Sequence, residues 1–293
     1  MTDRAASDLD PADLDAVAVL GAGTMGAGIA HVLARKGLRV LLCEVDSGAL
    51  NRGLKTIRNN LQRQAARDPG LEVEETMGRI RGVLNREDLA ECGFAIEAAT
   101  ERLEIKQQIF RDLDRILGPA AILASNTSSI SITGLACQTG RPGKVIGMHF
   151  FNPVPVMALV EIVRGLATEA ETYDKTRALA VRLGKTPVAV NDAPGFVSNR
   201  VLMPLLNEAM YAVMEGVATA EAVDEVFRLG MAHPMGPLAL ADLIGLDVCL
   251  DIMRVLEEGF GSAKFHPCPL LIRMVDAGWL GRKTGRGFYR YPG

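Results

Sequence analysis

The sequence predicts an α/β fold in which a doubly wound, mostly parallel β-sheet is followed by a smaller all-α domain. Short apolar runs alternate with helical patterns as far as about residue 190, and such alternation implies parallel strands joined by right-handed crossovers. Beyond Pro194 and Gly195, the apolar residues recur at helical spacing only. We therefore expect one domain over residues 15–192 and a second over residues 193–293.

The elements of the sheet begin close to the start of the first domain. Ala16–Leu20 (AVAVL) is a short apolar run that ends at a glycine, which is typical of a buried strand. A helix is expected from about Thr24, a second strand at Leu38–Cys43, and two helices over residues 47–81 that break at Asp68-Pro69-Gly70. Further strands are expected at 94–98, 121–124, 144–148, 159–163 and 187–190, with helices at 103–117 and 172–183.

The second domain is predicted to consist of helices. Apolar residues from Val197 to Met214 recur in steps of three, one and four, which places one wide apolar stripe along a helix. Thr219 can cap the next helix, and two more helical patterns cover 238–256 and 270–275. These helices carry more apolar surface than a small domain can bury, so we expect a homodimer formed through this domain.

Composition and charge narrow the possible function classes. The 293 residues are 48% hydrophobic and 23% charged, with a net charge of -3, which is an ordinary globular composition. Lysines and arginines are scattered, so no nucleic-acid partner is expected. No apolar run approaches transmembrane length, so no membrane partner is expected either.

Cysteine usage and the first residues point to a cytoplasmic protein. The five cysteines lie far apart and no cysteine or histidine cluster has metal-site spacing, so free thiols in a reducing compartment are expected and no metal site. The start of the chain is acidic, unlike a mitochondrial presequence, and it has no apolar signal core. We read residues 1–14 as a short disordered lead to which the sequence assigns no role.

Gly21-Ala22-Gly23-Thr24-Met25-Gly26 matches the pattern G-x-G-x-x-G, between a predicted strand and a predicted helix. Gly21 permits a tight turn, Gly23 lets a pyrophosphate approach the backbone, and Gly26 lets the helix pack closely on the strand. The N–H groups at the helix start, near Thr24 and Met25, then face the phosphates. This context predicts a Rossmann-type dinucleotide-binding domain, although a plain glycine turn remains the alternative.

Glu44 stands twenty-three residues after Gly21, at the tip of the second predicted strand. A carboxylate at this place can accept both hydroxyls of an adenine ribose and would repel a 2′-phosphate. The cofactor is therefore predicted to be NAD rather than NADP. Asp46 is a weaker candidate for the ribose contact, and a surface acid at a strand end is the other interpretation of Glu44.

His149 lies in the segment Met148–Val156 (MHFFNPVPV), at the end of an apolar strand. A lone histidine at such a place is more often a core residue than a catalyst. However, ligands of open α/β sheets bind at the carboxyl ends of the strands, and the chain has only four histidines. His149 is therefore a candidate catalytic residue.

In this segment and in several others, the chain resembles the 3-hydroxyacyl-CoA dehydrogenase family, in particular its short, single-function members of the 3-hydroxybutyryl-CoA dehydrogenase type. The resembling stretches occur in family order over about residues 15–291. They are GAGTMGAGIA (21–30), ASNTSSI (124–130), GMHFFNPVPVMALV (147–160) with Glu161, DAPGFVSNR (192–200), PMGP (234–237) and GRKTGRGFY (281–289).

The resemblance implies the catalytic residues. His149 matches the family's catalytic histidine, and Glu161 matches the carboxylate that pairs with it. Ser128 and Asn199 match residues at the substrate's reacting oxygen. These roles suit the chemistry, because an imidazole titrates near neutral pH and a carboxylate can fix its tautomer. Taken alone, Ser128 and Asn199 could be helix caps and Glu161 a solvated residue of an edge strand.

The resemblance also implies further NAD contacts, at Glu101, Lys106, Ser128, Asn152 and Lys283. Without it, Lys106 would be interpreted as a solvated helix face and Lys283 as a loop charge.

Phosphates of coenzyme A need cations, and the polar helical segment after Glu44 supplies several. We expect Lys55 to be a substrate contact, although a solvated helix explains it equally well.

The predicted reaction interconverts (S)-3-hydroxyacyl-CoA and 3-oxoacyl-CoA, with hydride transfer to NAD. The alternatives are an NAD-dependent dehydrogenase of free hydroxy acids or sugar acids, such as gulonate, and a catalytically silent NAD-binding structural protein. The sequence predicts neither the acyl-chain length nor the pathway, which could be fatty-acid breakdown, aromatic degradation, or butyrate or polyester synthesis.

Overall fold

The structure is a computed structural model that describes residue 14 and residues 16–292. Apart from Leu14, the expected N-terminal lead lies outside the described residues. The chain divides into two compact units, up to Asp192 and from Ala193 onward, and each unit is described by itself.

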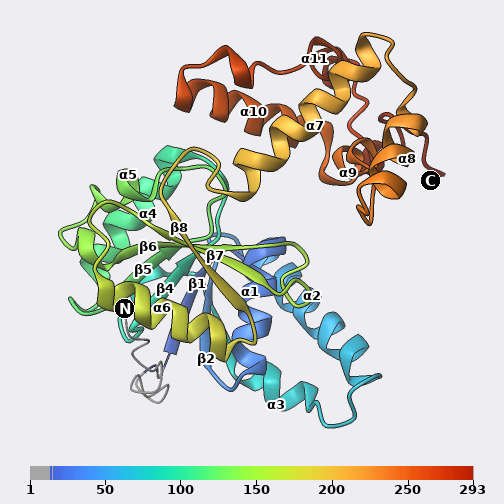
Figure 1. Cartoon of the computed structure of the whole chain (residues 1–293). Helices are drawn as coiled ribbons and strands as arrows, with labels where there is room; N and C mark the ends of the chain where they lie inside the picture. The colour runs from blue at the N-terminus through green and yellow to red at the C-terminus, as the bar shows by residue number, and fades with distance from the viewer. Residues whose placement is uncertain (1–13, 15, 293) are drawn as a thin grey trace, which may run out of the picture. The chain divides into compact units, whose positions relative to one another are not determined.

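The first unit is built around an eight-stranded sheet with the strand order β3-β2-β1-β4-β5-β6-β7-β8 (Figure 1). Its strands are β1 (Ala16–Leu20), β2 (Arg39–Cys43), β3 (Ile80–Val83), β4 (Phe94–Glu97), β5 (Ile122–Ser125), β6 (Val145–Phe150), β7 (Leu159–Arg164) and β8 (Thr186–Asn191). Its helices are α1 (Thr24–Arg35), α2 (Ser47–Ala65), α3 (Val73–Gly78), α4 (Leu103–Ile116), α5 (Ile132–Ala136) and α6 (Ala170–Arg182).

The topology confirms the predicted doubly wound, mostly parallel sheet. The chain builds outward from β1 to β3, returns to β4 on the other side of β1, and continues to β8. Strands β1 to β6 pair in parallel, whereas β7 runs antiparallel to β6 and β8 runs parallel to β7. All five residues of β1 are buried, as expected for a central parallel strand that is covered on both faces.

Two short elements of the first unit depart from the sequence-based expectation. Residues 80–83 form the edge strand β3, although the helical pattern was expected to continue to residue 81. This strand is hard to detect because it is only four residues long, contains a glycine and exposes two of its residues. Helix α5 was not anticipated, because five residues are too few for a clear period of 3.6.

The second unit is helical, as predicted. Its helices are α7 (Ser198–Met214), α8 (Ala220–Gly230), α9 (Pro237–Ile244), α10 (Leu246–Phe260) and α11 (Pro269–Asp276). The side-chain oxygen of Thr219 accepts a hydrogen bond from the Ala222 N–H and caps α8 as expected. The pattern over 238–256 forms two helices rather than one, because Gly245 has a φ of +107° and ends α9.

Among the described residues, no helix is both long and apolar enough to cross a lipid bilayer.

Candidate active site

The turn between β1 and α1 requires glycine at two of its three glycine positions, Gly21 and Gly26. Gly21 has a φ of +99°, and a Cβ atom there would lie 2.6 Å from the Ala98 carbonyl oxygen. At Gly26, a Cβ atom would lie 1.8 Å from the Gly21 carbonyl oxygen, so only glycine lets α1 start this close to the strand. A Cβ atom at Gly23, by contrast, would have no atom of the described residues within 4 Å. The turn therefore leaves room for a ligand at the one glycine that faces outward.

A cavity of about 530 Å³ opens beside this turn. It lies at the carboxyl ends of β1, β2 and β4, where the winding of the sheet changes direction, and open α/β sheets bind their ligands at such a point. The residues that line it are Leu20, Gly21, Gly23, Thr24, Met25, Cys43, Glu44, Val45, Arg86, Ala98, Ala99, Thr100, Ile105 and Ile109. The chemistry of this lining fits a dinucleotide, because it combines the open backbone at Gly23 with the carboxylate of Glu44.

Glu44 is held in place by main-chain N–H groups. One carboxylate oxygen accepts from Ala22 N at 2.9 Å and the other accepts from Val45 N at 2.8 Å. The neighbouring Asp46 instead caps α2, where it accepts from Ala49 N at 2.6 Å. Of these two acids, Glu44 is the one that lines the cavity.

His149 and Glu161 face each other across the antiparallel pair β6 and β7, as direct partners in the register. The imidazole Nδ1 lies 2.8 Å from a carboxylate oxygen of Glu161. His149 is 8% exposed and Glu161 is 2% exposed, and the ring of Phe151 lies against the imidazole at a centroid distance of 4.8 Å. Because β7 lies between β6 and β8, Glu161 is not a solvated residue of an edge strand.

This geometry sets the chemistry of the imidazole. An ionised Glu161 can only accept a hydrogen bond, so Nδ1 carries the donated hydrogen and the basic lone pair is on Nε2. The carboxylate then stabilises the imidazolium that forms when Nε2 takes a proton. His149 is near the carboxyl end of β6, and this strand runs parallel to the strands beside the cavity.

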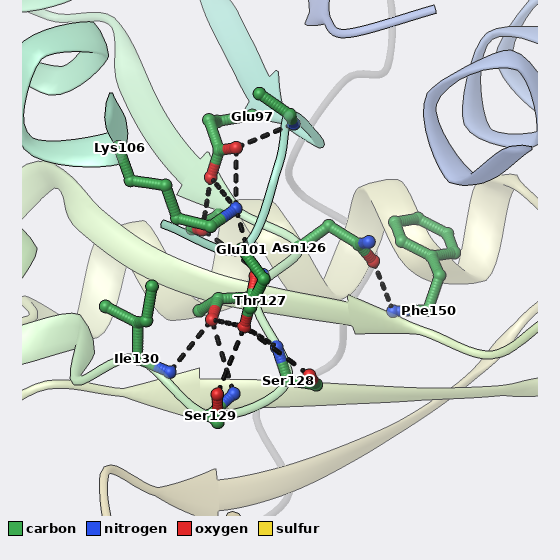
Figure 2. A network of polar contacts seen from close by, with 11 residues as sticks. Glu97, Glu101, Lys106, Asn126, Thr127, Ser128, Ser129, Ile130 and Phe150 are labelled. Carbon is green, nitrogen blue, oxygen red and sulfur yellow. Dashed lines mark hydrogen bonds and ion pairs between the residues drawn. The ribbon is translucent and has the colours of Figure 1, made fainter. Parts of the chain in front are cut away.

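Ser128 belongs to a loop after β5 that is bound to Glu101 (Figure 2). A carboxylate oxygen of Glu101 accepts from Ser128 N at 2.9 Å and from Ser129 Oγ at 3.2 Å, and it also accepts from the Thr127 hydroxyl. The cap of α5 is Ser131, whose Oγ accepts from Gly134 N at 3.0 Å. Ser128 is therefore not the cap of that helix.

Lys106 is buried, at 1% exposure, and does not lie on a solvated helix face. Its Nζ pairs with Glu97 at 2.7 Å and with Glu101 at 3.3 Å. Burial by itself would raise the pKa of Glu101. The pKa is nevertheless lowered, because Lys106 and the hydrogen bonds from Thr127 and Ser128 stabilise the carboxylate.

The remaining four predicted contacts lie on four different segments of the chain. Asn152 is exposed in the loop after β6, and Lys55 is exposed on α2. Asn199 lies in the first turn of α7, in the second unit. Lys283, also in the second unit, pairs with Asp247 at 2.5 Å. In the first unit, the glycine turn, Glu44 and the loop after β5 that carries Ser128 (the serine loop) thus follow the carboxyl ends of parallel strands. The His149–Glu161 pair lies on β6 and β7.

Several residues near these strand ends were not anticipated from the sequence. Asn126 Oδ1 accepts from Phe150 N at 2.9 Å and ties the serine loop to β6. Lys185 Nζ donates to the carbonyl oxygens of Val154 and Met157, in the loop that follows β6. Glu97 is fully buried at the end of β4. An acid that ends an otherwise apolar strand, as in FAIE, is the signal that could have identified Glu97.

Comparison with known proteins agrees with this geometry. Residues 16–193 match the NAD binding domain of 3-hydroxyacyl-CoA dehydrogenase, and residues 195–291 match the C-terminal domain of the same enzymes. The chain belongs to the 3-hydroxyacyl-CoA dehydrogenase family. The predicted family, enzyme class and cofactor are thereby confirmed: the chain is an NAD-linked 3-hydroxyacyl-CoA dehydrogenase.

Individual relatives of the dehydrogenase cover almost its whole length. A probable 3-hydroxybutyryl-CoA dehydrogenase of Bacillus subtilis is 53% identical over 95% of this chain and 98% of its own. A 3-hydroxybutyryl-CoA dehydrogenase of Bradyrhizobium diazoefficiens is 50% identical over 94% and 95%. The crystal structure of (S)-3-hydroxybutyryl-CoA dehydrogenase from Ralstonia eutropha aligns with a TM-score of 0.93 at 47% identity, over 96% of this chain and 100% of that one.

Proposed function

We propose that this dehydrogenase interconverts (S)-3-hydroxyacyl-CoA and 3-oxoacyl-CoA with short acyl chains, and that His149 is its general base, paired with Glu161. The observation that carries the proposal is the 2.8 Å contact between the buried imidazole and carboxylate. The relatives named 3-hydroxybutyryl-CoA dehydrogenase support a short acyl chain.

The NAD site is assigned to the cavity beside the glycine turn. The backbone of Gly21–Gly26 would receive the pyrophosphate, because the start of α1 offers N–H groups and the positive end of the helix dipole. Glu44 would accept the hydroxyls of the adenine ribose. Glu101, Lys106, Asn152 and Lys283 are proposed as further contacts. When bound, NAD supplies the acceptor for the hydride that leaves the substrate carbon.

His149 accounts for the proton in this reaction. In the oxidative direction, Nε2 removes the hydroxyl proton of the 3-hydroxyacyl group, and in the reductive direction it returns the proton to the 3-oxo oxygen. Glu161 holds the tautomer and offsets the positive charge on the imidazolium. We assign Ser128 and Asn199 to the orientation of the substrate oxygen, because neutral hydrogen-bonding groups can hold that oxygen without forming an ion pair with it.

Coenzyme A recognition is proposed to use Lys55, which is exposed on α2. A cation there can bind a phosphate of the substrate at a site open to solvent. Exposed arginines on the same helix, such as Arg52, make this assignment one of several that the helix allows.

The test is an NADH absorbance assay with matched substrates. Acetoacetyl-CoA should be reduced, whereas free acetoacetate and gulonate should not be turned over in the corresponding directions. Turnover of either free acid in preference to the thioester would favour the hydroxy-acid or sugar-acid alternative. Tight NADH binding with no turnover of any substrate would favour a silent NAD-binding protein. A C4-to-C16 ladder of 3-oxoacyl-CoA substrates would then measure the preferred acyl length.

We further propose a homodimer formed through the helical domain, in the cytoplasm. Apolar side chains on and just after α8 support the dimer, since Val226, Leu229 and Met231 are each more than half exposed. Four of the five cysteines are buried free thiols, which suits a reducing compartment. In this account, residues 15–192 bind NAD, and residues 193–293 contribute to substrate binding and dimerisation.

A further inference from the structure

Glu97 has no part in the chemistry described so far, yet it is the most buried of the acids near the carboxyl ends of the parallel strands. It is the last residue of β4, and in the register it lies between Leu20 of β1 and Ser125 of β5. Its side chain is 0% exposed. Its carboxylate accepts from Lys106 Nζ at 2.7 and 2.8 Å, from Ser125 Oγ at 2.6 Å and from Ala99 N at 2.7 Å.

These contacts are part of a closed ring of five residues, which are Glu97, Ser125, Thr127, Glu101 and Lys106. All of them except Ser125 are labelled in Figure 2. From Glu97, one arm passes through Ser125 Oγ, which accepts from Thr127 N at 3.2 Å. The other arm passes through Lys106 to Glu101. Glu101 then accepts from the Thr127 hydroxyl, where the two arms meet. The ring thus ties the end of β4, the end of β5 and helix α4 to the serine loop.

Burying the charged groups of this ring contributes little net stability to the fold. A buried ion pair loses about as much in desolvation as it gains in attraction, and apolar residues of the same size are often as stabilising. Here two carboxylates, Glu97 and Glu101, share one buried ammonium. Such an arrangement is expected where fixed geometry is needed rather than stability alone.

The ring lies between the two ends of the proposed dinucleotide site. Glu44 follows β2, and His149 is on β6, while the ring joins β4 to β5. A dinucleotide whose adenine ribose is held by Glu44 would extend toward β6, because the hydride leaves the substrate carbon whose hydroxyl proton His149 would take. Its nicotinamide half would then pass the segment after Glu97, where Ala98 and Ala99 line the cavity.

We propose that Glu97 is a positioning residue, which holds Lys106, Glu101 and the Ser128 loop in the arrangement that receives the nicotinamide half of NAD. Glu97 does not touch the cofactor or the substrate in this proposal and acts through its two hydrogen-bonded arms. The inference rests on the proposed function, because it uses the assignment of Glu101 and Ser128 to the cofactor and substrate.

The first test is Glu97→Gln, measured by ligand binding rather than by turnover. A glutamine has one acceptor oxygen for donors that now share two, and its NH₂ group would face another donor. NADH affinity in a fluorescence titration should fall by about tenfold or more, because several hydrogen bonds to a charged group are disturbed. Affinity for 5′-AMP should stay unchanged, because Glu44 and the glycine turn keep their own contacts.

Ser125→Ala is the second variant, and it keeps the inference testable if Glu97→Gln does not fold. It leaves the buried charges paired and cuts only the arm from Glu97 to Thr127. It should weaken NADH binding in the same direction with a smaller effect. Thr176→Ala is the matched control, since Thr176 is an equally buried hydroxyl whose Oγ donates to the Thr172 carbonyl within α6. It should leave binding of both nucleotides unchanged.

The outcomes separate the inference from the proposed function. If Glu97→Gln and Ser125→Ala lower the melting temperature but bind NADH as the parent does, Glu97 is merely structural and the inference is wrong. Equal losses for NADH and 5′-AMP would also contradict it, because the nicotinamide half would not be singled out. Failure of the parent enzyme to reduce acetoacetyl-CoA would overturn the proposed function alone, since the binding comparison needs no turnover.

Discussion

At the scale of single residues, three glutamates at the sheet illustrate how surroundings assign different tasks to one side chain. Glu44 is held by main-chain N–H groups beside an open cavity. Glu97 is enclosed and shares a lysine with a second acid. Glu161 is buried against one imidazole nitrogen. Their partners suit, in turn, the binding of hydroxyls, the fixing of a loop and the stabilisation of an imidazolium.

Replacing Glu161 by glutamine tests the last of these tasks. The amide can still accept a hydrogen bond from Nδ1, but the imidazolium loses its negative partner. We expect the turnover number to fall by about 10²–10⁴-fold, the usual contribution of general-base catalysis, with NADH affinity unchanged. Steady-state rates with acetoacetyl-CoA measure this, and Glu171→Gln, at an exposed acid of α6, is the control. Turnover close to that of the parent would remove Glu161 from the mechanism.

Cofactor choice is tested at Glu44. In Glu44→Ala, the ribose hydroxyls lose their acceptor and a 2′-phosphate loses its repulsion, so kcat/KM should fall for NAD and discrimination against NADP should relax. Asp46→Ala is a matched control two residues away. It should cost about 1 kcal/mol of stability, because it removes the cap of α2, and should leave cofactor preference unchanged. An unaltered preference in Glu44→Ala would refute the ribose contact.

At the scale of elements, apolar periodicity and turn residues predict most strands of the sheet, but they do not predict the short elements β3 and α5. The first strand and the starts of the helices at Thr24 and Leu103 could be predicted, because apolar runs and glycines mark them. Strand β3 could not, since its pairing with β2 comes from tertiary contacts that a four-residue pattern does not encode. For the same reason, the ring around Glu97 joins residues from three elements and has no local signature.

The loop between β6 and β7 gives a prediction at this scale. Lys185, which lies just before β8 and is 8% exposed, donates to the carbonyls of Val154 and Met157 and so holds the loop that carries Asn152. Lys185→Met would leave those acceptors without the ammonium. We expect the free energy of unfolding to fall by about 1–3 kcal/mol for each buried group left unpaired. Urea denaturation measures the loss.

Lys175→Met is the control for that experiment, because the ion pair of Lys175 with Glu171 is an exposed i,i+4 pair and such pairs contribute little. A loss at Lys185 no greater than that at Lys175 would mean that the ammonium does not hold the loop. A loss of stability with unchanged kcat/KM would mean that the loop does not affect the active site.

At the scale of the whole molecule, the change in apolar spacing near residue 193 predicts two domains, and the structure has two compact units that divide after Asp192. The predicted site residues are shared between the units, with Asn199 and Lys283 in the second. What the sequence alone could not supply is the set of side-chain contacts, such as the register that places His149 opposite Glu161.

Assembly is the property to test at this scale. The dehydrogenase should have twice the mass of one 31.4 kDa chain in light scattering. Because Val226 and Leu229 of α8 are exposed apolar residues, the variant Val226→Glu with Leu229→Glu should shift the mass to that of a monomer. Leu166→Glu, at a 93% exposed residue of the first unit, should remain dimeric. A parent protein of monomer mass would contradict the proposed dimer.

The most direct test of the central claim is the turnover of His149→Gln with acetoacetyl-CoA and NADH, measured beside NADH binding on the same preparation. If the imidazole moves the proton, turnover should fall by about 10²–10⁴-fold while the dissociation constant for NADH stays the same. Turnover close to that of the parent, with NADH bound equally well, would contradict the account.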